Sequence, residues 1–596
     1  MAYVLADNII SPLGNTSEEN YLSVKAGKSG IRTFEPESHG IPEGFTASLL
    51  SDDEQSPFKH GDFEHLAIAS AQQAMSPLPL DWGSDRVVFI LSSTKGAIEK
   101  LQKKENKTGE NEESVTGESS KGESEESDLS SSAQRIAQRL GITTTPIVVC
   151  NACISGLSAL ILGSRLIEEG RYDYAVVCGV DCPDRFIISG FQSLKALSTI
   201  PCRPFDIERF GLNLGEAAAT IVLGKNVRRR RSEDAWQIGA GYVKNDAFHI
   251  SAPSKTAEGL YAALSETLQQ AHLQGMTEDK EDGNAITNEL AFVNAHGTAT
   301  LFNDQMESIA IQRAGLSSLP TNALKGYFGH TLGAAGILET IISMKAIDDH
   351  TILGTRGFEE LGVSGKVNIS TESLPTDKHA FIKMLSGFGG CNATLWASKG
   401  RENIQFLSSH TKEAGAKQHT IKITPEEIVV DGKLWEESPS LTTLYKQHIG
   451  DYPKYYKMNG LSRLGFVASE ILLQQEGKDE EAKGNHAFSR AIVLFNHSSS
   501  IASDRKYLSS IANAAEYFPS PSVFVYTLPN IVTGEIAMRH GYHGETSFYI
   551  LPHKDESQMH DILRAAFLDP VTQSILGGWI DYEDEAHFEA ELSIYS

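Results

Sequence analysis

Short runs rich in valine and isoleucine alternate along the chain with longer apolar stretches of helical spacing. The expected strands are residues 86–91, 147–149, 174–177, 218–223 and 291–293. These runs are mostly apolar, which is typical of strands that are buried on both faces. Their alternation with helices predicts an α/β fold built on mixed or parallel sheets.

One polar segment interrupts this pattern. Residues 103–128 consist almost entirely of Lys, Glu, Ser, Gly, Asn and Thr, without an aromatic residue. Such a segment buries too little apolar area to offset the entropy that is lost on ordering. We therefore expect an acidic, disordered surface insertion at 103–128.

The C-terminal part of the chain carries a weak copy of an earlier part. Ile136-Ala-Gln-Arg-Leu-Gly141 recurs 400 residues later as Ile536-Ala-Met-Arg-His-Gly541, and a strand-like segment follows each copy. Less closely, residues 84–93 recur as 489–498, with the arginine 404 residues later. Self-similarity of this kind predicts duplicated architecture, and chance similarity between two α/β segments is the alternative.

Length and composition narrow the class of protein. A chain of 596 residues is several times the length of a typical domain, and 40% hydrophobic with 22% charged residues is near the globular average. A net charge of −25 disfavours binding to the phosphate backbone of nucleic acids. We see no apolar run of about 18 residues and no basic leader at the N-terminus, so we expect a cytoplasmic protein without a membrane span.

The cysteines are placed as reduced thiols are, beside apolar strand-like runs and within the first two thirds of the chain. They are Cys150, Cys153, Cys178, Cys182, Cys202 and Cys391. Cys150 and Cys153 have the spacing of half a zinc site, but no second Cys or His pair follows at a matching distance. The sequence therefore predicts neither disulfides nor a metal site.

Cys153 is a candidate nucleophile because it lies where an apolar strand ends and a small, apolar helix begins. A thiol in such a turn faces the positive end of the helix dipole, which is expected to lower its pKa. In the register of the repeat its counterpart is His553, so the second copy has no cysteine there. The alternative is an inert core cysteine.

Two histidines in glycine-rich surroundings favour the functional interpretation. His296 follows a strand-like run and precedes Gly297, and His330 opens a helix that is too apolar to lie on the surface. Within that helix Glu339 is a lone acid, and a buried carboxylate needs a cation, for which Lys325 is the nearest candidate. Either histidine alone could be a satisfied core residue, but a cysteine and two histidines at element ends indicate one site.

The ordered motifs of residues 1–400 resemble the 3-oxoacyl-ACP synthases (β-ketoacyl synthases) of the thiolase-like condensing enzymes. The motifs that carry the resemblance are Ile10-Ser-Pro-Leu-Gly14, Ala26-Gly-Lys-Ser-Gly-Ile31, Asn151-Ala-Cys153-Ile-Ser-Gly156, Arg203-Pro-Phe-Asp206, Leu214-Gly-Glu216, His296-Gly-Thr-Ala-Thr300, Gly329-His330-Thr-Leu-Gly-Ala-Ala-Gly336 and Gly387-Phe-Gly-Gly390. The resemblance implies a layered, duplicated αβαβα fold for residues 1–403. The repeat and the absence of a cysteine at its equivalent position lead us to expect that residues 404–596 are a degenerate, non-catalytic half domain that serves as an interface.

The resemblance also implies the roles of individual residues. Cys153, His296 and His330 would form a Cys-His-His triad, supported by Lys325 and Glu339. The backbone of Phe388 would belong to the oxyanion and gating segment. Two departures from the family pattern are Asn151, in place of the usual threonine, and Ser386, in place of a common phenylalanine.

The implied reaction is a decarboxylative Claisen condensation of an acyl thioester with malonyl-ACP, in fatty acid or polyketide synthesis. It needs no metal and no organic cofactor, because the acyl carrier protein brings the phosphopantetheine. A homodimer or a synthase partner subunit is the expected assembly. A non-catalytic subunit like a chain-length factor would have lost Cys153, and a thiolase would use a second cysteine, for which Cys391 is the candidate. A cysteine protease has no other support.

Overall fold

The computed structural model describes residues 2–53, 55–98, 128–226, 235–273, 289–400, 417–437, 440–476, 486–512 and 517–596. Residues 103–127 of the expected insertion lie outside the described residues, as does the expected domain boundary at 403–404. Asp128, the last residue of the insertion, is the N-cap of α5 (Leu129–Arg139) and accepts the backbone N–H of Ser131. Among the described residues no helix is both long and apolar enough to cross a bilayer.

A mixed sheet of five strands forms the first layer of the N-terminal part. Its order is β5 (Ile147–Val149), β4 (Val87–Ser92), β6 (Tyr174–Asp181), β8 (Ala217–Gly224) and β1 (Ala2–Ile10). β4, β5 and β6 are parallel, whereas β8 is antiparallel to both β6 and β1. β4, β5, β6 and β8 are buried almost throughout, as their apolar runs predict, whereas the middle of β1 is only partly buried.

A second mixed sheet lies in the same part of the chain. Its order is β9 (Trp236–Asn245), β16 (Cys391–Lys399), β15 (Ala380–Gly387), β10 (Leu290–Asn294), β11 (Pro320–Asn322) and β13 (Asn368–Ile369). Two residues of β1 pair with β9 and join the two sheets at their edges.

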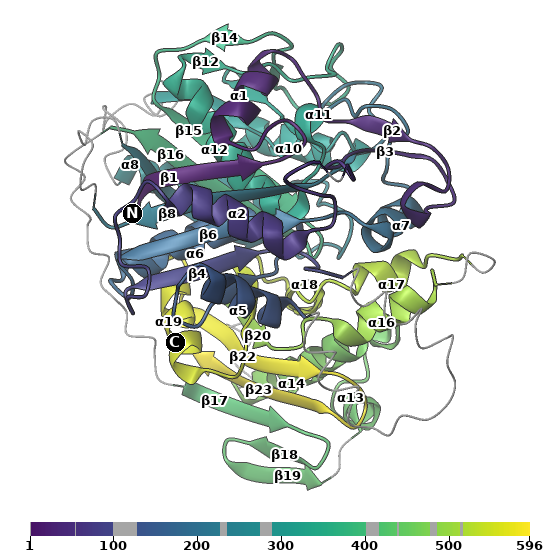
Figure 1. Cartoon of the computed structure of the whole chain (residues 1–596). Coiled ribbons are helices and arrows are strands. Elements are labelled where there is room, and N and C mark those ends of the chain that lie inside the picture. The colour runs from purple at the N-terminus through teal and green to yellow at the C-terminus, as the bar shows by residue number, and fades with distance from the viewer. Residues whose placement is uncertain are drawn as a thin grey trace.

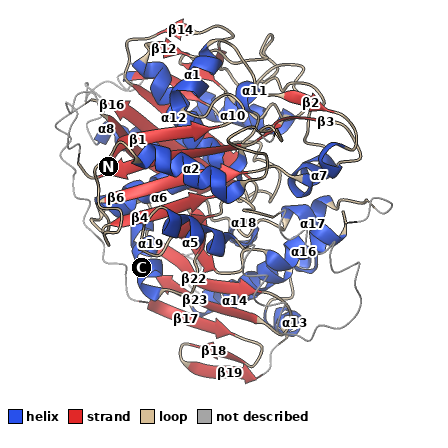
Figure 2. Cartoon of the chain, in the orientation of Figure 1, coloured by secondary structure: helices blue, strands red, loops and turns tan. Residues whose placement is uncertain are grey.

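Helices occupy three layers around these two sheets (Figure 2). Between the sheets lie α6 (Ser155–Glu168) and α12 (Ala335–Asp348), which are buried on almost all sides because their residues are small or apolar. The outer layers contain α2 (Phe63–Met75) with α5, and α8 (Glu258–Leu273) with α10 (Leu301–Arg313). The arrangement confirms the expected layered αβαβα fold.

Shorter elements complete the N-terminal part. They are α1 (Ser17–Lys25), α7 (Arg185–Ser193) and α11 (Lys325–Phe328), a small sheet of β2 (Arg32–Phe34), β3 (Phe45–Ser48) and β7 (Leu214–Gly215), and the pair β12 (Thr351–Ile352) and β14 (Leu374–Pro375).

We call the described residues from 417 to 596 the C-terminal unit. Its sheet has the order β21 (Thr546–Ile550), β20 (Arg490–Asn496), β22 (Ser574–Tyr582), β23 (Phe588–Tyr595), β17 (Lys417–Ile423), β18 (Glu427–Val430) and β19 (Lys433–Glu437). The first five strands repeat the order and the directions of the first sheet, β5-β4-β6-β8-β1. The expected partial thiolase-like fold is therefore present.

The helices of the C-terminal unit also follow the repeat. One face of its sheet is covered by α14 (Gly460–Gln475) and α18 (Ile531–His540). α19 (Glu556–Ala566) packs on the strands and on α6. The peripheral helices are α13 (Leu441–His448), α16 (Ile501–Ser509) and α17 (Pro521–Val525). The first pair of repeated segments, 136–141 and 536–541, forms the C-terminal ends of equivalent helices, α5 and α18. Gly141 and Gly541 follow these helices, and both have the left-handed backbone conformation that favours glycine. The second pair falls on β4 and β20.

The two copies meet edge to edge and form one continuous sheet (Figure 1). β21 runs antiparallel to β5, with Tyr549 opposite Val149. The N–H of Cys150 donates to Phe548 O at 3.1 Å, and the N–H of Phe548 donates to Asn151 Oδ1 at 2.7 Å. The asparagine that departs from the family pattern therefore satisfies a backbone donor of the C-terminal unit.

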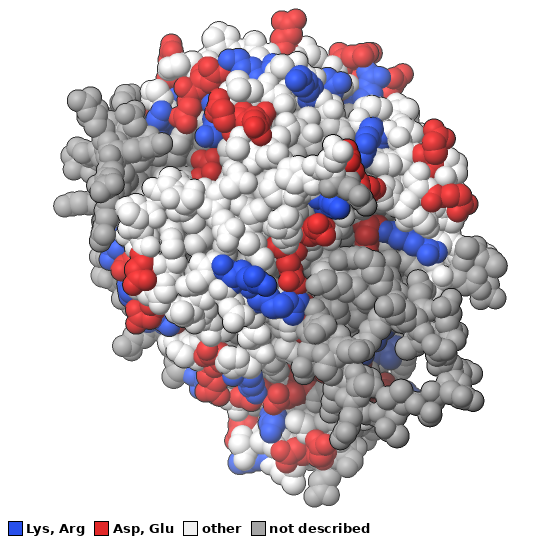
Figure 3. Space-filling model, viewed as in Figure 1, with Lys and Arg blue, Asp and Glu red and all other residues white. Residues whose placement is uncertain are grey.

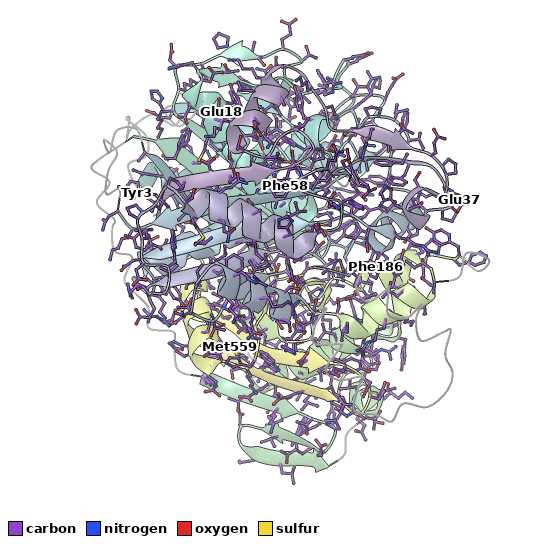
Figure 4. The ribbon with its side chains drawn as sticks, in the orientation of Figure 1. Tyr3, Glu18, Glu37, Phe58, Phe186 and Met559 are labelled. Atoms are coloured by element: carbon purple, nitrogen blue, oxygen red, sulfur yellow. The ribbon has the colours of Figure 1, made fainter. Side chains whose placement is uncertain are left out.

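Buried charges and aromatic rings fix the same interface. Three buried ion pairs cross it, namely Lys95–Asp504 at 2.6 Å, Arg165–Glu545 at 2.7 Å and Lys244–Asp569 at 2.7 Å. Phe186 of α7 packs against Tyr507 and Phe524 of the C-terminal unit, next to α16 and α17 (Figure 4). Because a buried charge that loses its partner is costly, the two parts depend on each other for stability.

Candidate active site

Cys153 lies in the sharp turn that the sequence predicts between a strand and a helix. β5 ends at Val149, a single 3-10 turn spans Ala152–Ile154, and α6 begins at Ser155. Ala152 has φ +48°, an unusual backbone conformation for a residue other than glycine. A Cβ at Gly156 would lie only 2.6 Å from the carbonyl oxygen of Gly333, so glycine is needed where this turn meets the next one.

The turn that carries His330 has the same form. Leu332 has φ +51°, a 3-10 turn spans Leu332–Ala334, and α12 follows. His296 comes two residues after the end of β10. The structure thus brings three predicted residues from separate elements to one place.

The three side chains converge closely. The sulfur of Cys153 and one ring nitrogen each of His296 and His330 all lie within 4.8 Å of one another. The two imidazole rings are 4.9 Å apart between centroids and nearly perpendicular. Among the described residues no other group of three or more His, Cys, Asp or Glu side chains converges in this way. The donor set resembles a metal site, but Cys150, the other half of the CxxC spacing, is directed at the carbonyl of Thr94 instead.

The triad opens into a cavity of about 360 Å³. Both histidines are buried, Cys153 is half-buried, and Phe388 also lines the cavity. Large apolar side chains that are mostly exposed stand at its wall, among them Phe210 at 69% and Phe302 at 72% exposure. The site therefore combines a thiol and two imidazoles with an apolar path to solvent, as a site for a long, thin substrate would.

A second, much smaller cavity of about 20 Å³ also touches Cys153. Phe191, Leu332 and Phe388 of the N-terminal part line it together with three residues of the C-terminal unit, which are Phe524, Thr527 and Leu528. A space of this size holds little more than one water molecule. The C-terminal unit thus closes an apolar space directly beside the candidate nucleophile.

Hydrogen bonding fixes the tautomer of His330. The backbone N–H of Leu332 donates to His330 Nδ1 at 3.3 Å, so the neutral ring carries its proton on Nε2. Nε2 is buried and has no hydrogen-bond partner among the described residues. Burial and the nearby positive charge of Lys325 hold the pKa of both histidines well below its usual range, which keeps both rings neutral at pH 7.

The thiol of Cys153 differs from the sequence-based expectation. Burial raises its pKa to about 12, although Lys325 and the backbone N–H groups of Cys153 and Phe388 act to lower it. The prediction of a lowered pKa was wrong because removal of the thiolate from water outweighs the favourable local charges. The same two backbone N–H groups lie close to the sulfur, where they could also donate to an oxyanion that forms beside it.

Lys325 and Glu339 form the predicted ion pair, and the structure adds a second lysine. The amines of Lys325 and Lys383 each contact one carboxylate oxygen of Glu339, and all three side chains are buried. Lys383 also donates to the carbonyl of Ala295, next to His296, at 3.1 Å. Two lysines and one glutamate leave an excess positive charge behind the histidines.

Two further carboxylates position the catalytic turns. Glu307 of α10 accepts the backbone N–H groups of His296 at 2.6 Å and Gly297 at 2.8 Å. Asp181, at the end of β6, accepts the N–H of Gly333 at 2.7 Å, within the turn that follows His330. Sequence reasoning missed Lys383, Glu307 and Asp181. For Lys383 in β15 and Asp181 in β6 the available signal was the same as for Glu339, a charged residue in an otherwise apolar element, whereas α10 is polar along much of its length and gave no such signal for Glu307.

The loop around Phe388 follows β15. Ser386 donates to Asn392 Oδ1 at 2.7 Å, and the ring of Phe388 stacks on Phe191 with centroids 6.2 Å apart. Cys391 lies behind the loop, where its sulfur contacts the carbonyl of Phe388 at 3.3 Å, and it does not line the cavity of the triad. This position does not suit a second catalytic cysteine.

Fold and site together define a thiolase-like condensing enzyme. The family described as beta-ketoacyl synthase, N-terminal domain, matches residues 3–228, and beta-ketoacyl synthase, C-terminal domain, matches residues 237–359. The chain belongs to the beta-ketoacyl synthase family, and it is a condensing enzyme of fatty acid or polyketide synthesis.

Known relatives and structures cover different shares of the chain. A putative mitochondrial 3-oxoacyl-acyl-carrier-protein synthase from Schizosaccharomyces pombe is 26% identical over 429 residues, which is 65% of this chain and 97% of that protein. A ketosynthase in complex with its chain length factor, from Xenorhabdus doucetiae, has 25% identity and a TM-score of 0.54 over 67% of this chain and 98% of that one.

One solved structure matches the chain in full. The PfaC keto synthase-chain length factor covers 100% of this chain and 78% of its own, with a TM-score of 0.72 and 12% sequence identity. This likeness concerns the fold alone, and it extends over the C-terminal unit. The repeated strand order in our structure is in keeping with it.

Proposed function

We propose that Cys153 is the nucleophile that accepts the acyl group. Its sulfur attacks the carbonyl carbon of an acyl thioester, and the backbone N–H groups of Cys153 and Phe388 stabilise the tetrahedral oxyanion. Collapse of this intermediate breaks the carbon–sulfur bond of the donor and releases its thiol. The convergence of Cys153, His296 and His330 in one cavity is the observation that carries this proposal.

The raised pKa of Cys153 gives one histidine a task in the acylation step. A thiol that is protonated at pH 7 must lose its proton during attack, and a neutral imidazole can accept it. His330 already carries its proton on Nε2, so its cavity-side nitrogen cannot take another, and His296 is the base that remains. The proton then passes to the departing thiol.

The condensation step uses the same histidines differently. A malonyl thioester loses CO₂, and the resulting enolate carbon attacks the acyl-cysteine to form the new carbon–carbon bond. His330 Nε2–H donates to the enolate oxygen, while the excess positive charge of Lys325, Lys383 and Glu339 stabilises the anion through space. The product is a 3-oxoacyl thioester two carbons longer, and Cys153 is regenerated.

We further propose an acyl carrier protein as the donor of both thioesters. The cavity reaches the buried sulfur along an apolar wall, which suits an acyl group carried on a flexible phosphopantetheine arm. The arm arrives with the substrate, so the protein needs no metal or cofactor of its own. On the face shown in Figure 3 basic and acidic side chains of the described residues are interspersed, without the extended basic surface that nucleic acids require. A cytoplasmic location and a homodimer remain predictions.

A single comparison tests the nucleophile. Incubation with an acyl-carrier-protein thioester should add one acyl mass to the intact protein, and Cys153→Ala should abolish both this adduct and condensation. Cys178→Ala, which removes a buried thiol within β6, is the matched control and should keep the adduct. Retention of the adduct in Cys153→Ala, or its transfer to Cys391, would refute the assignment. Faster reaction with free CoA thioesters than with carrier-protein thioesters would favour a thiolase.

A further inference from the structure

The Phe388–Gly389 turn, which carries one of the two oxyanion donors, is in contact with the C-terminal unit. Asn530, directly before α18, donates from Nδ2 to the carbonyl oxygen of Phe388 at 2.8 Å. Gly389 has φ +90° and no side chain, so it is held through its backbone alone, and its N–H donates to Ile250 O at 2.7 Å. The position of the Phe388 N–H therefore depends on the groups that donate hydrogen bonds to the carbonyl oxygens of Phe388 and Gly389.

Asn530 does not use its side chain as asparagines in its position usually do. It is the N-cap of α18, where an asparagine normally accepts a backbone N–H from the first turn of its own helix. Its side chain makes no such bond. It is buried and is directed across the interface to the carbonyl of Phe388. Asn530 therefore makes a hydrogen bond to the turn at Phe388 and Gly389 in place of the usual cap bond within its own helix.

Backbone packing around Asn530 supports the same contact. A Cβ at Gly534, in the first turn of α18, would lie 2.5 Å from the carbonyl oxygen of Gly389, so α18 lies directly against the turn. The carbonyl of Gly389 in turn accepts Asn245 Nδ2 at 2.8 Å. The same nitrogen of Asn245 lies 3.0 Å from Thr546 Oγ1 in β21. Both carbonyls of the turn are therefore linked to the C-terminal unit.

We propose that Asn530 is a positioning residue of the active site, through which the catalytically silent C-terminal unit holds the Phe388 N–H in place for the acylation step. The inference rests on the proposed role of Phe388 in the oxyanion hole. Among the described residues, Asn530 donates from its side chain to the carbonyl of Phe388 and the sulfur of Cys391, and to neither Cys153 nor His330, which serves the enolate. Its loss should therefore slow acylation and leave malonyl decarboxylation nearly unchanged.

The experiment separates these two steps in the full-length protein. Asn530→Asp keeps the size of the side chain and a good helix N-cap, but it replaces the N–H donor with an oxygen that repels the Phe388 carbonyl. We expect acylation of Cys153, followed by intact mass, to slow by about 10- to 100-fold, less than the 10²–10³ typical of an oxyanion donor that is removed outright. Release of CO₂ from a malonyl thioester, without an acyl donor, should stay within about three-fold of the wild type.

Two further variants make the test specific. Gly534→Ala should give the same selective defect, because its new Cβ pushes the Gly389 carbonyl away. Asn459→Asp is the matched control, since Asn459 is the N-cap of α14 in the same unit and bonds to Ser462 N, Ser503 and Tyr526, none of which lines either cavity. It should leave both steps unchanged.

Each outcome has a distinct meaning. Wild-type acylation rates in folded Asn530→Asp would overturn the inference. Equal losses in acylation and decarboxylation, together with a lower melting temperature, would also overturn it and show a purely structural role. Absence of acylation in the wild type would instead refute the proposed function.

Discussion

The two turns that follow β5 and β21 have the same place in the same strand order, yet only one of them holds a reactive group. The first carries Cys153 and is enclosed by the turn of His330 and by the Phe388 loop. The second carries His553, which is exposed between β21 and α19. The same strand order therefore occurs with and without a cysteine in this turn, and the described residues around His553 do not enclose it as Cys153 is enclosed.

The missing surrounding is the second sheet with its helices. In the N-terminal part this sheet supplies His296 and the Phe388 loop, and α12 covers α6. The described strands of the C-terminal unit include counterparts of the first sheet only. α19, the counterpart of α6, presents polar residues such as Glu556 and His560 to solvent. The outer side of α19 is therefore solvated, and the C-terminal unit is attached by its strand edge and by the packing of α19 on α6.

Removal of the C-terminal unit is the change with the largest expected effect. A chain that ends at residue 400 exposes the unpaired edge of β5, leaves Lys95 and Arg165 without their acidic partners, and leaves Lys244 with Glu266 alone. A buried charge that loses its partner costs up to about 3–5 kcal/mol, so two such losses are a large part of the stability of a typical domain. We expect an aggregated, inactive protein in size-exclusion chromatography and condensation assays.

Co-expression of residues 401–596 as a separate polypeptide is the control for this deletion. If the two parts associate through β5 and β21, the second polypeptide should restore soluble and active protein. A soluble truncated chain with wild-type activity would show that the first copy does not need the second.

The charge behind the histidines provides the next test, which concerns the first copy alone. Burial lowers the pKa of Lys383 to about 8, so this lysine loses its charge as the pH rises through 8. Both histidines have lowered pKa values and stay neutral at pH 6–8. Malonyl decarboxylation should therefore be constant between about pH 6.5 and 7.5 and should decline above pH 8.

Lys383→Met separates the contribution of this lysine from general instability. The variant should lower the neutral plateau, on the order of 10-fold for a charge that acts through space, and should remove the decline above pH 8. His330→Ala should lower the plateau further, by about 10²–10³, because the enolate loses a direct donor. A sigmoid rise centred near pH 6.5 would contradict the neutral histidines.

Sequence patterns were informative for the parts of the site that lie in local motifs. Cys153, His296 and His330 each sit beside glycines at the end of an element, and Lys325 is close to Glu339 along the chain. Lys383 comes from β15, and only the packing of α12 against β15 brings it to Glu339. The pKa of Cys153 depends on burial by residues distant in sequence, so local features predicted the wrong direction.

The same distinction applies to the repeat. Two short anchors located the equivalent helices and strands, because helix ends with glycine and apolar strands leave local signals. The contact between Asn530 and Phe388 left none, since it joins residues 142 positions apart across an edge-to-edge pairing. The two repeated segments do not indicate which side of the second copy contacts the first.

The small cavity beside Cys153 allows a test of whether the C-terminal unit influences the acyl chain length that the active site prefers. Phe524→Leu removes part of a ring from its wall, and room for two more methylene groups is worth about 1.6 kcal/mol, roughly 10-fold. We expect kcat/KM to rise by about this factor for acyl donors two carbons longer than the best wild-type donor. Phe518→Ala, at an exposed site of the same unit, should leave the acyl preference unchanged.

The smallest effect is expected from giving the second copy the nucleophile of the first. His553→Cys places a thiol in the turn between β21 and α19, but the structure shows no histidine pair facing it among the described residues, and the turn is open to water. Stability should change by no more than about 0.5 kcal/mol, as for most surface substitutions. In the double variant Cys153→Ala/His553→Cys, no acyl adduct should form from an acyl-carrier-protein thioester.

An adduct on the introduced thiol, formed at a rate near that of Cys153 in the wild type, would mean that the turn alone activates the thiol. The comparison between the two copies would then lose its basis, because the enclosing second sheet would not be required for acylation.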